Sequence, residues 1–179
     1  MNYTPVSNFA RKVWTECVTK LVCMAKSIIV CTSVSHGNTK KIADAIGGVL
    51  DAPVVAPAAA DLSDCDMVGF GSGIYFGSFH SDLRAFVESL PQQDGRTAFL
   101  FATSGLPETR LTRFSGRLVE LLENKGFDVV GGFSCRGFDT FLPFKLVGGI
   151  RKGQPDEDDV ASARAFAEHL RDAVGNDRG

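Results

Sequence analysis

Residues 33–39, with the sequence Ser-Val-Ser-His-Gly-Asn-Thr, constrain the fold of this chain more than any other segment. They directly follow the apolar run 27–32 and directly precede an amphipathic run over 40–50. In open α/β sheets a strand, a small polar loop and a helix in this order form an anion site, because the N–H groups and macrodipole of a helix N-terminus favour negative charge. Gly37 allows close backbone approach or a positive φ. The pattern favours a phosphate-binding loop, and the alternative is a connector that only caps the helix.

Two better-known phosphate motifs are absent from this segment. It contains neither the Gly-Lys-Ser/Thr of a Walker loop nor a GxGxxG dinucleotide turn. Its hydroxyl-rich composition indicates a single phosphate group, bound without a metal. The three histidines stand in no metal-ligand pattern, so we expect no zinc site.

Apolar runs alternate with helical patterns along the chain, which predicts a doubly wound, five-stranded parallel α/β sheet. The apolar spacing also predicts helices, of which one ends at Pro91 and one at Gly126, while the last has an acidic start over 156–159. The connection 56–66 carries little helix signal. The expected strands are 27–32, 53–56, 66–71, 97–103 and 128–134.

Length, charge and cysteine content exclude several classes of protein. A chain of 179 residues fits one domain, and a net charge of -2 argues against nucleic-acid binding. The five cysteines form no CxxC pair, which favours thiols in a reducing compartment over a disulfide framework. We find no secretory signal and no bilayer-spanning run. The expected location is the cytoplasm.

Three segments divide the chain: residues 1–23, a domain over 24–175 and a tail over 176–179. The first segment is an amphipathic helical pattern that holds the only tryptophan, Trp14. It is interpreted either as a helix packed on the domain or as an upstream start, since Met24 begins a complete domain. A partner or membrane-surface helix is the disfavoured alternative, because the basic face is thin.

Two further segments follow the third and fourth expected strands. Residues 71–80 are interpreted as a loop in which three glycines alternate with Tyr75, Phe76 and Phe79, although Phe79 is expected in the core. Residues 103–107 are small and could place amide groups against the edge of a flat ligand. Ligands of open α/β sheets bind at the carboxyl ends of the strands, so these segments and 33–39 should meet.

The domain resembles a short-chain flavodoxin. Its His-Gly-Asn-Thr is similar to the Thr-Gly-Asn-Thr phosphate loop of flavodoxins, and 71–77 resemble the aromatic loop of flavodoxin-like, menaquinone-dependent protoporphyrinogen oxidases. The resemblance implies FMN and strand order 2-1-3-4-5. It implies that the FMN phosphate contacts Ser35, His36, Gly37, Asn38 and Thr39, with Ser33 nearby. It implies that the isoalloxazine lies against Gly73, Ile74, Tyr75, Phe76 and Gly77, and against Thr103, Ser104 and Gly105.

His36 stands where flavodoxins usually carry threonine, and we expect it to bind through its backbone N–H rather than its ring. Asp82, Arg84 and Glu88 are expected on a solvated helix face. Arg136 either stabilises an anionic reduced flavin or pairs with Asp139.

The long apolar segment after the fifth strand has three interpretations. Residues 138–150 form a platform for an apolar redox partner such as a quinone, a homodimer interface, or a flap that closes the sheet edge. Cys135, just before it, is either a redox thiol or, as we favour, a buried and inert one.

The sequence therefore predicts an FMN-binding protein of electron transfer, whose partner is a redox protein or a small apolar acceptor such as a quinone. No catalytic triad, carboxylate pair or metal is needed for this chemistry, because the flavin carries the electrons. One alternative is an enzyme that oxidises an organic substrate with a quinone. The other is a module that binds a different phosphate ligand.

Overall fold

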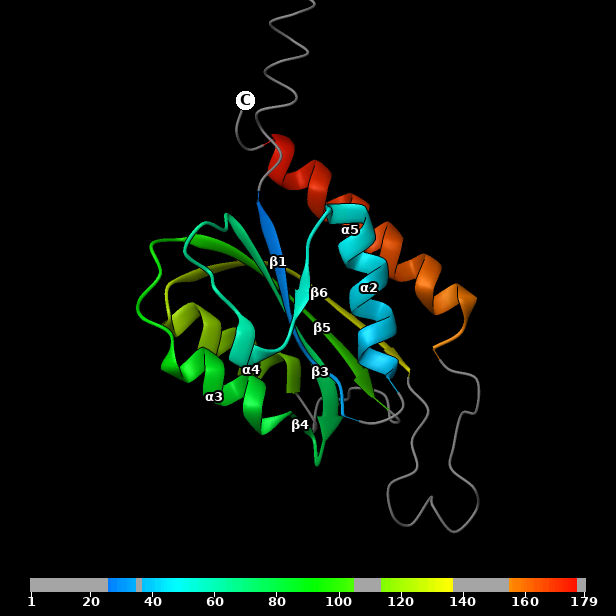
Figure 1. Cartoon of the computed structure of the whole chain (residues 1–179), viewed down its shortest axis with the longest axis horizontal. Helices are drawn as coiled ribbons and strands as arrows, with labels where there is room; N and C mark the ends of the chain where they lie inside the picture. The colour runs from blue at the N-terminus through cyan, green and yellow to red at the C-terminus, as the bar shows by residue number, and fades with distance from the viewer. Residues whose placement is uncertain (1–25, 35–36, 105–113, 137–154, 177–179) are drawn as a thin grey trace, which may run out of the picture.

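Strands and helices alternate along the chain in this computed structural model, which describes residues 26–34, 37–104, 114–136 and 155–176 (Figure 1). The strands are β1 (Ser27–Thr32), β2 (Val54–Val55), β3 (Met67–Tyr75), β4 (Ser78–Phe79), β5 (Arg96–Ser104) and β6 (Phe127–Arg136). The helices are α2 (Asn38–Leu50), the 3-10 helix η1 (Pro57–Ala59), α3 (Ser81–Ser89), α4 (Phe114–Asn124) and α5 (Glu157–Asn176).

The strands form one sheet in the order β2-β1-β3-β5-β6, and β4 pairs only with β3. The pairs along this path are parallel, whereas β4 runs antiparallel to β3. Without β4, the order is the 2-1-3-4-5 implied by the flavodoxin resemblance. The predicted doubly wound α/β fold and its strand order are confirmed.

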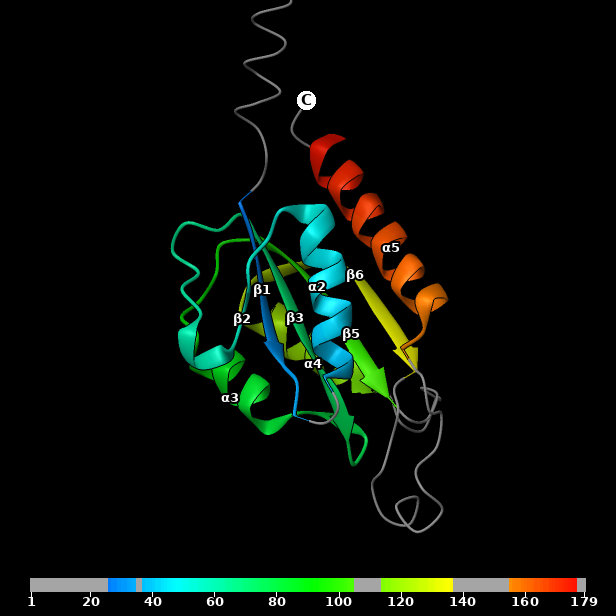
Figure 2. The ribbon, with the colours of Figure 1, turned by 45° about the vertical axis from the view of Figure 1, so that its right-hand side comes forward.

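Alternating side chains of the buried strands supply two cores, one on each face of the sheet. In β1, Ile29 packs with α2 and α5, while Ile28 and Val30 pack with α3 and α4. Both figures show α2 and α5 on one side of the sheet and α3 and α4 on the other (Figures 1 and 2). The predicted helical faces are buried as expected, because residues such as Ile42, Ile46 and Leu170 lie in these cores.

Two glycines of β3 leave room for phenyl rings from β5. Gly69 and Gly71 lie in register with Phe99 and Phe101, and a Cβ atom at either glycine would collide with the ring of its partner. Both rings are fully buried. A glycine inside a strand often marks such a close approach.

Residues 71–80 are not the loop that their composition predicts. Gly71 to Tyr75 continue β3, and a two-residue turn at Phe76 and Gly77 leads into β4. Both turn residues have positive φ, of 51° and 71°. This geometry matches the twist of a hairpin and suits glycine, but it is unusual for phenylalanine. Phe79 is 3% exposed, which confirms its predicted place in the core.

Several predictions fall on residues outside the described ranges. Apart from three site residues, these are the N-terminal segment 1–23, the pairing of Arg136 with Asp139, the segment 138–150 and residues 177–179 of the predicted tail 176–179. Among the described helices, none combines the length and the apolar character that crossing a bilayer requires.

Candidate site at the carboxyl edge of the sheet

The carboxyl ends of β1, β3 and β5 meet at one edge of the sheet, and α2 begins at this edge (Figure 2). The adjacent parallel pairs end with Thr32 beside Ser72 and with Gly73 beside Thr103. The three segments that the sequence assigns to a ligand therefore converge on one edge. This is where open α/β sheets bind ligands.

The N-terminus of α2 carries no negative charge of its own. Its N-cap residue, Gly37, has φ 69°, and the first turn contains no acidic residue. Nothing lies within 4 Å of a Cβ built at Gly37, so the space beside the turn is open. The first N–H groups of a helix lack partners within the helix. This terminus therefore offers space, N–H groups and positive potential to an anion.

Ser33 reaches the same turn from the end of β1. Its hydroxyl oxygen accepts a hydrogen bond of 3.3 Å from the N–H of Lys40. The side chain of Lys40 turns to Asp44, with 2.7 Å between Nζ and Oδ2. Ser33 thus ties the loop to α2 and keeps its own proton for a second acceptor.

A buried hydrogen bond joins α2 to β5 at this edge. The hydroxyl oxygens of Thr39 and Thr103 are 2.8 Å apart, and either can be the donor. The side chains are only 2% and 5% exposed. Two hydroxyls carry two protons and this contact uses one, so the pair retains one donor. It connects the segment predicted to bind the phosphate with one predicted to border the ring.

The hairpin of β3 and β4 forms the other wall of this edge. The Tyr75 ring lies over Gly73, because a Cβ at Gly73 would be 3.0–3.2 Å from atoms of that ring. The Tyr75 and His80 rings make an edge-to-face contact with centroids 5.4 Å apart. Phe76 at the tip is 88% exposed. Of the predicted aromatic residues, Tyr75 and Phe76 therefore lie at the edge, and Phe79 does not.

Two residues that support the hairpin were missed by the sequence reasoning. The buried hydroxyl of Ser72 donates to the carbonyl oxygen of Gly73 at 2.8 Å and accepts from the N–H of His80 at 3.0 Å. His80 caps α3, since its Nδ1 accepts from the N–H of Asp82 at 3.2 Å. No local pattern marks these contacts, and the histidine only precedes a polar helix start. Asp82, Arg84 and Glu88 are exposed as predicted.

The predicted site residues fall into two groups. Ser35, His36 and Gly105 lie outside the described residues. The others stand at this edge: Ser33, Gly37, Asn38, Thr39, Gly73, Ile74, Tyr75, Phe76, Gly77, Thr103 and Ser104. The structure brings them to one end of the sheet, and their contacts with a cofactor stay a prediction.

Two thiols lie buried near this edge. Burial raises the pKa of Cys31 and of Cys135 to about 12, with smaller contributions from Asp44 and from Asp159 respectively. Cys135 packs in the core under α5. These environments suppress the reactive thiolate, which agrees with the interpretation of Cys135 as inert. In the described ranges, no three histidine, cysteine or acidic side chains gather as a metal site.

Comparison with known proteins gives the family. Residues 29–132 match the flavodoxin domain. The chain belongs to this family. Over 148 residues it is 37% identical to an uncharacterised protein of Methanocaldococcus jannaschii, a match that covers 81% of this chain and 97% of that protein.

Solved structures share the fold at low identity. Oxidised flavodoxin 2 of Bacillus cereus superposes with a TM-score of 0.59 at 23% identity, covering 80% of this chain and 95% of that one. The Flv1 flavodiiron core of Synechocystis gives a TM-score of 0.61 at 10% identity and covers 93% of this chain. The flavodoxin-like chain spans only 40% of the length of that flavodiiron core.

Proposed function

We propose that this flavodoxin-domain protein binds FMN without a covalent bond and acts in electron transfer. The observation that carries the proposal is the N-terminus of α2, which is open and free of acidic residues at the edge where β1, β3 and β5 end. Family membership and the flavodoxin fold add to this support.

The donors at this edge fit a phosphate group. Asn38 and Thr39 lie in the first turn of α2, and the Ser33 hydroxyl borders it. These donors are uncharged, so the macrodipole and N–H groups would supply the attraction for the phosphate. The bond between Thr39 and Thr103 holds the start of α2 at a fixed distance from the end of β5.

The flat part of the cofactor would lie between the β3–β4 hairpin and the end of β5. Gly73 and Thr103 are paired neighbours there, and Tyr75 covers Gly73 from one side. The surrounding residues would orient the ring and exclude water from it. Bound FMN supplies one- and two-electron redox chemistry, while the protein binds and tunes it.

The decisive experiment compares FMN with riboflavin, which lacks the phosphate. We expect the wild-type chain to bind FMN at least about a hundredfold more tightly than riboflavin, because hydrogen bonds to a charged group contribute ~1.5–3 kcal/mol each. The double substitution Asn38→Ala, Thr39→Ala should remove most of this preference. Quenching of flavin fluorescence measures both affinities.

The matched control is Thr97→Ala, which removes a threonine hydroxyl at the opposite end of β5. Circular dichroism verifies that each variant folds. Equal binding of FMN and riboflavin by the wild-type chain, or a double variant with wild-type preference, would refute the phosphate site.

The electron partner belongs to the same proposal. A redox protein or a small apolar acceptor such as a quinone fits a carrier whose site lies at an edge of the sheet. The described cysteines, Cys31, Cys65 and Cys135, are free thiols, which supports a reducing, cytoplasmic location. Stopped-flow reoxidation of the reduced protein by each type of acceptor separates the two.

A further inference from the structure

A groove of about 680 Å³ lies beside the start of α2, away from the predicted flavin ring. The ends of β1 and β2, η1 and one side of α3 line it. Its volume is in the range of small-molecule sites. Of the predicted cofactor residues, only Ser33 borders it, and neither the β3–β4 hairpin nor the end of β5 contributes. The groove is therefore separate from the region proposed for the isoalloxazine.

A hydroxyl without a partner lies at this groove. Thr32 lines it and is 8% exposed, and its Oγ1 atom is buried without a hydrogen bond. The neighbouring hydroxyl of Ser72, in register on β3, has both a donor and an acceptor. Buried hydroxyls are normally satisfied, so Thr32 needs an explanation. Rotation about χ1 moves Oγ1 among three staggered positions, so the hydroxyl can turn toward a ligand.

The charges that border the groove are already paired within the protein. The Lys40 ammonium lies 2.7 Å from the Asp44 carboxylate. The Asp82 carboxylate accepts a hydrogen bond of 3.3 Å from the Ser81 hydroxyl. The wall is otherwise mostly apolar, with Val55, Pro57 and Phe86 among its residues. An uncharged ligand suits this lining, because it leaves the ion pair of Lys40 and Asp44 closed.

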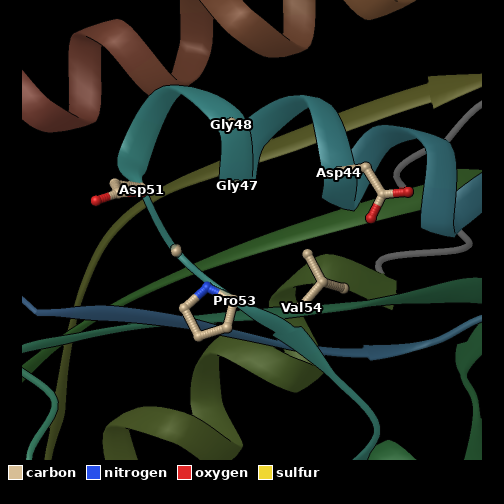
Figure 3. Close-up of a pocket in the computed structure, with 7 residues that line it drawn as sticks. Asp44, Gly47, Gly48, Asp51, Pro53 and Val54 are labelled. Atoms are coloured by element: carbon tan, nitrogen blue, oxygen red, sulfur yellow. The ribbon is translucent and has the colours of Figure 1, made fainter.

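A second groove lacks the buried, unpaired hydroxyl that the first groove has. It has about 530 Å³ and lies between the last turns of α2 and the segment leading into β2 (Figure 3). Its polar side chains, Asp44 and Asp51, are exposed, and it contains no buried hydroxyl without a partner. This second groove has no comparable feature and serves as a control surface.

We propose that the groove at Thr32 binds an uncharged compound of one or two rings that carries a carbonyl or hydroxyl group. The rings lie against the apolar wall, and the polar group pairs with the Thr32 hydroxyl. This site is additional to the proposed flavin site and does not depend on it.

The experiment uses 1-indanone and indane, two probes that differ by one carbonyl oxygen. Ligand-observed NMR titrations of the full chain give both dissociation constants. We expect 1-indanone to bind about threefold to tenfold more tightly than indane, as one neutral hydrogen bond allows. Thr32→Val should abolish this difference, and Thr32→Ser should retain it. Because valine removes an unpaired buried hydroxyl, the melting temperature of Thr32→Val should not fall.

Occlusion tests the location of the probes. Ala85→Phe, on the exposed side of α3 that lines the groove, should weaken both probes. Gly48→Phe fills the second groove, where nothing lies within 4 Å of a Cβ, and should change neither. No saturable binding by the wild-type chain, a ketone preference that survives Thr32→Val, or weakening by Gly48→Phe alone would overturn the inference.

An FMN titration in the same samples keeps the two proposals distinct. Displacement of 1-indanone by FMN would overturn a separate groove site. Binding of 1-indanone without any binding of FMN would support the groove and refute only the flavin proposal.

Discussion

The N-termini of α2 and α5 differ in whether the protein itself places negative charge at the positive end of the helix dipole. At α5 the protein supplies the negative charge itself: Glu157, Asp158 and Asp159 fill the first turn. Asp156 and Asp159 also exchange hydrogen bonds between side chain and N–H, at 3.0 and 3.2 Å. At α2 the corresponding turn has no acidic residue, and a glycine stands at the N-cap.

The difference separates a helix start that is complete within the protein from one that suits an external anion. A reciprocal cap satisfies the donors of α5 and complements its dipole. At α2 the N–H of Lys40 donates to the Ser33 hydroxyl, which belongs to the polar segment before the helix and carries no charge. The α3 start resembles α5, since His80 caps it and Asp82 lies in its first turn.

The largest effect is expected from giving α2 an acidic first turn. Asn38→Asp should weaken FMN binding about tenfold more than Asn38→Ala does. Both variants lose the amide, but only aspartate adds a negative charge that repels the phosphate at the N-terminus of α2. Flavin fluorescence titrations at low ionic strength measure this. Riboflavin affinity is the control and should be equal in the two variants; an equal FMN affinity would contradict an anion at this turn.

A smaller effect is expected from removing the cap of α5. Asp156→Ala should lower the free energy of unfolding by about 1 kcal/mol, the usual cost of losing an N-cap side chain. Urea denaturation followed by circular dichroism measures it. FMN affinity should stay at the wild-type value, and a loss comparable to that of Asn38→Ala would mean that the two termini are not independent.

The smallest effect concerns the thiols beside the two helices. The pKa of Cys31 and of Cys135 is raised to about 12, mainly by burial, so alkylation by iodoacetamide should be slow at pH 8. It should speed up about tenfold per pH unit up to pH 11, because the thiolate is the reactive form. Asp159→Asn should lower the pKa of Cys135 and raise its rate roughly twofold, because a nearby negative charge is removed.

Cys31 is the internal control, since Asp159 does not contribute to its pKa shift. Peptide mass mapping reports each cysteine separately. Rapid labelling of Cys135 at pH 8 in the folded wild-type chain would show that it is not inert.

The fold was predictable because buried parallel strands are continuous apolar runs. The predicted strand 27–32 coincides with β1, and the acidic residues over 156–159 correctly indicated the start of α5. The β3–β4 hairpin was not predictable from composition, because glycines such as Gly71 and Gly73 are typical of turns and loops. They belong to a strand because Phe101 and Tyr75 occupy the space of their missing side chains.

The site was predictable only in part. The polar loop marked the start of α2, but the link between Thr39 and Thr103 joins residues 64 positions apart, and no local pattern indicates such a contact. No pattern in the sequence indicates that the Thr32 hydroxyl lacks a partner while the hydroxyl of the neighbouring Ser72 has two. The roles of these residues toward a cofactor stay predictions.

The packing of Phe101 onto Gly71 limits which substitutions this sheet can accept during evolution. Gly71 has no side chain and Phe101 has a large one, so the two positions together hold the volume of a single large side chain. A larger side chain at residue 71 is tolerated only if residue 101 has already become smaller. The two substitutions can therefore occur in evolution only in that order. Homologues with a larger residue on β3 should therefore carry a compensating reduction on β5.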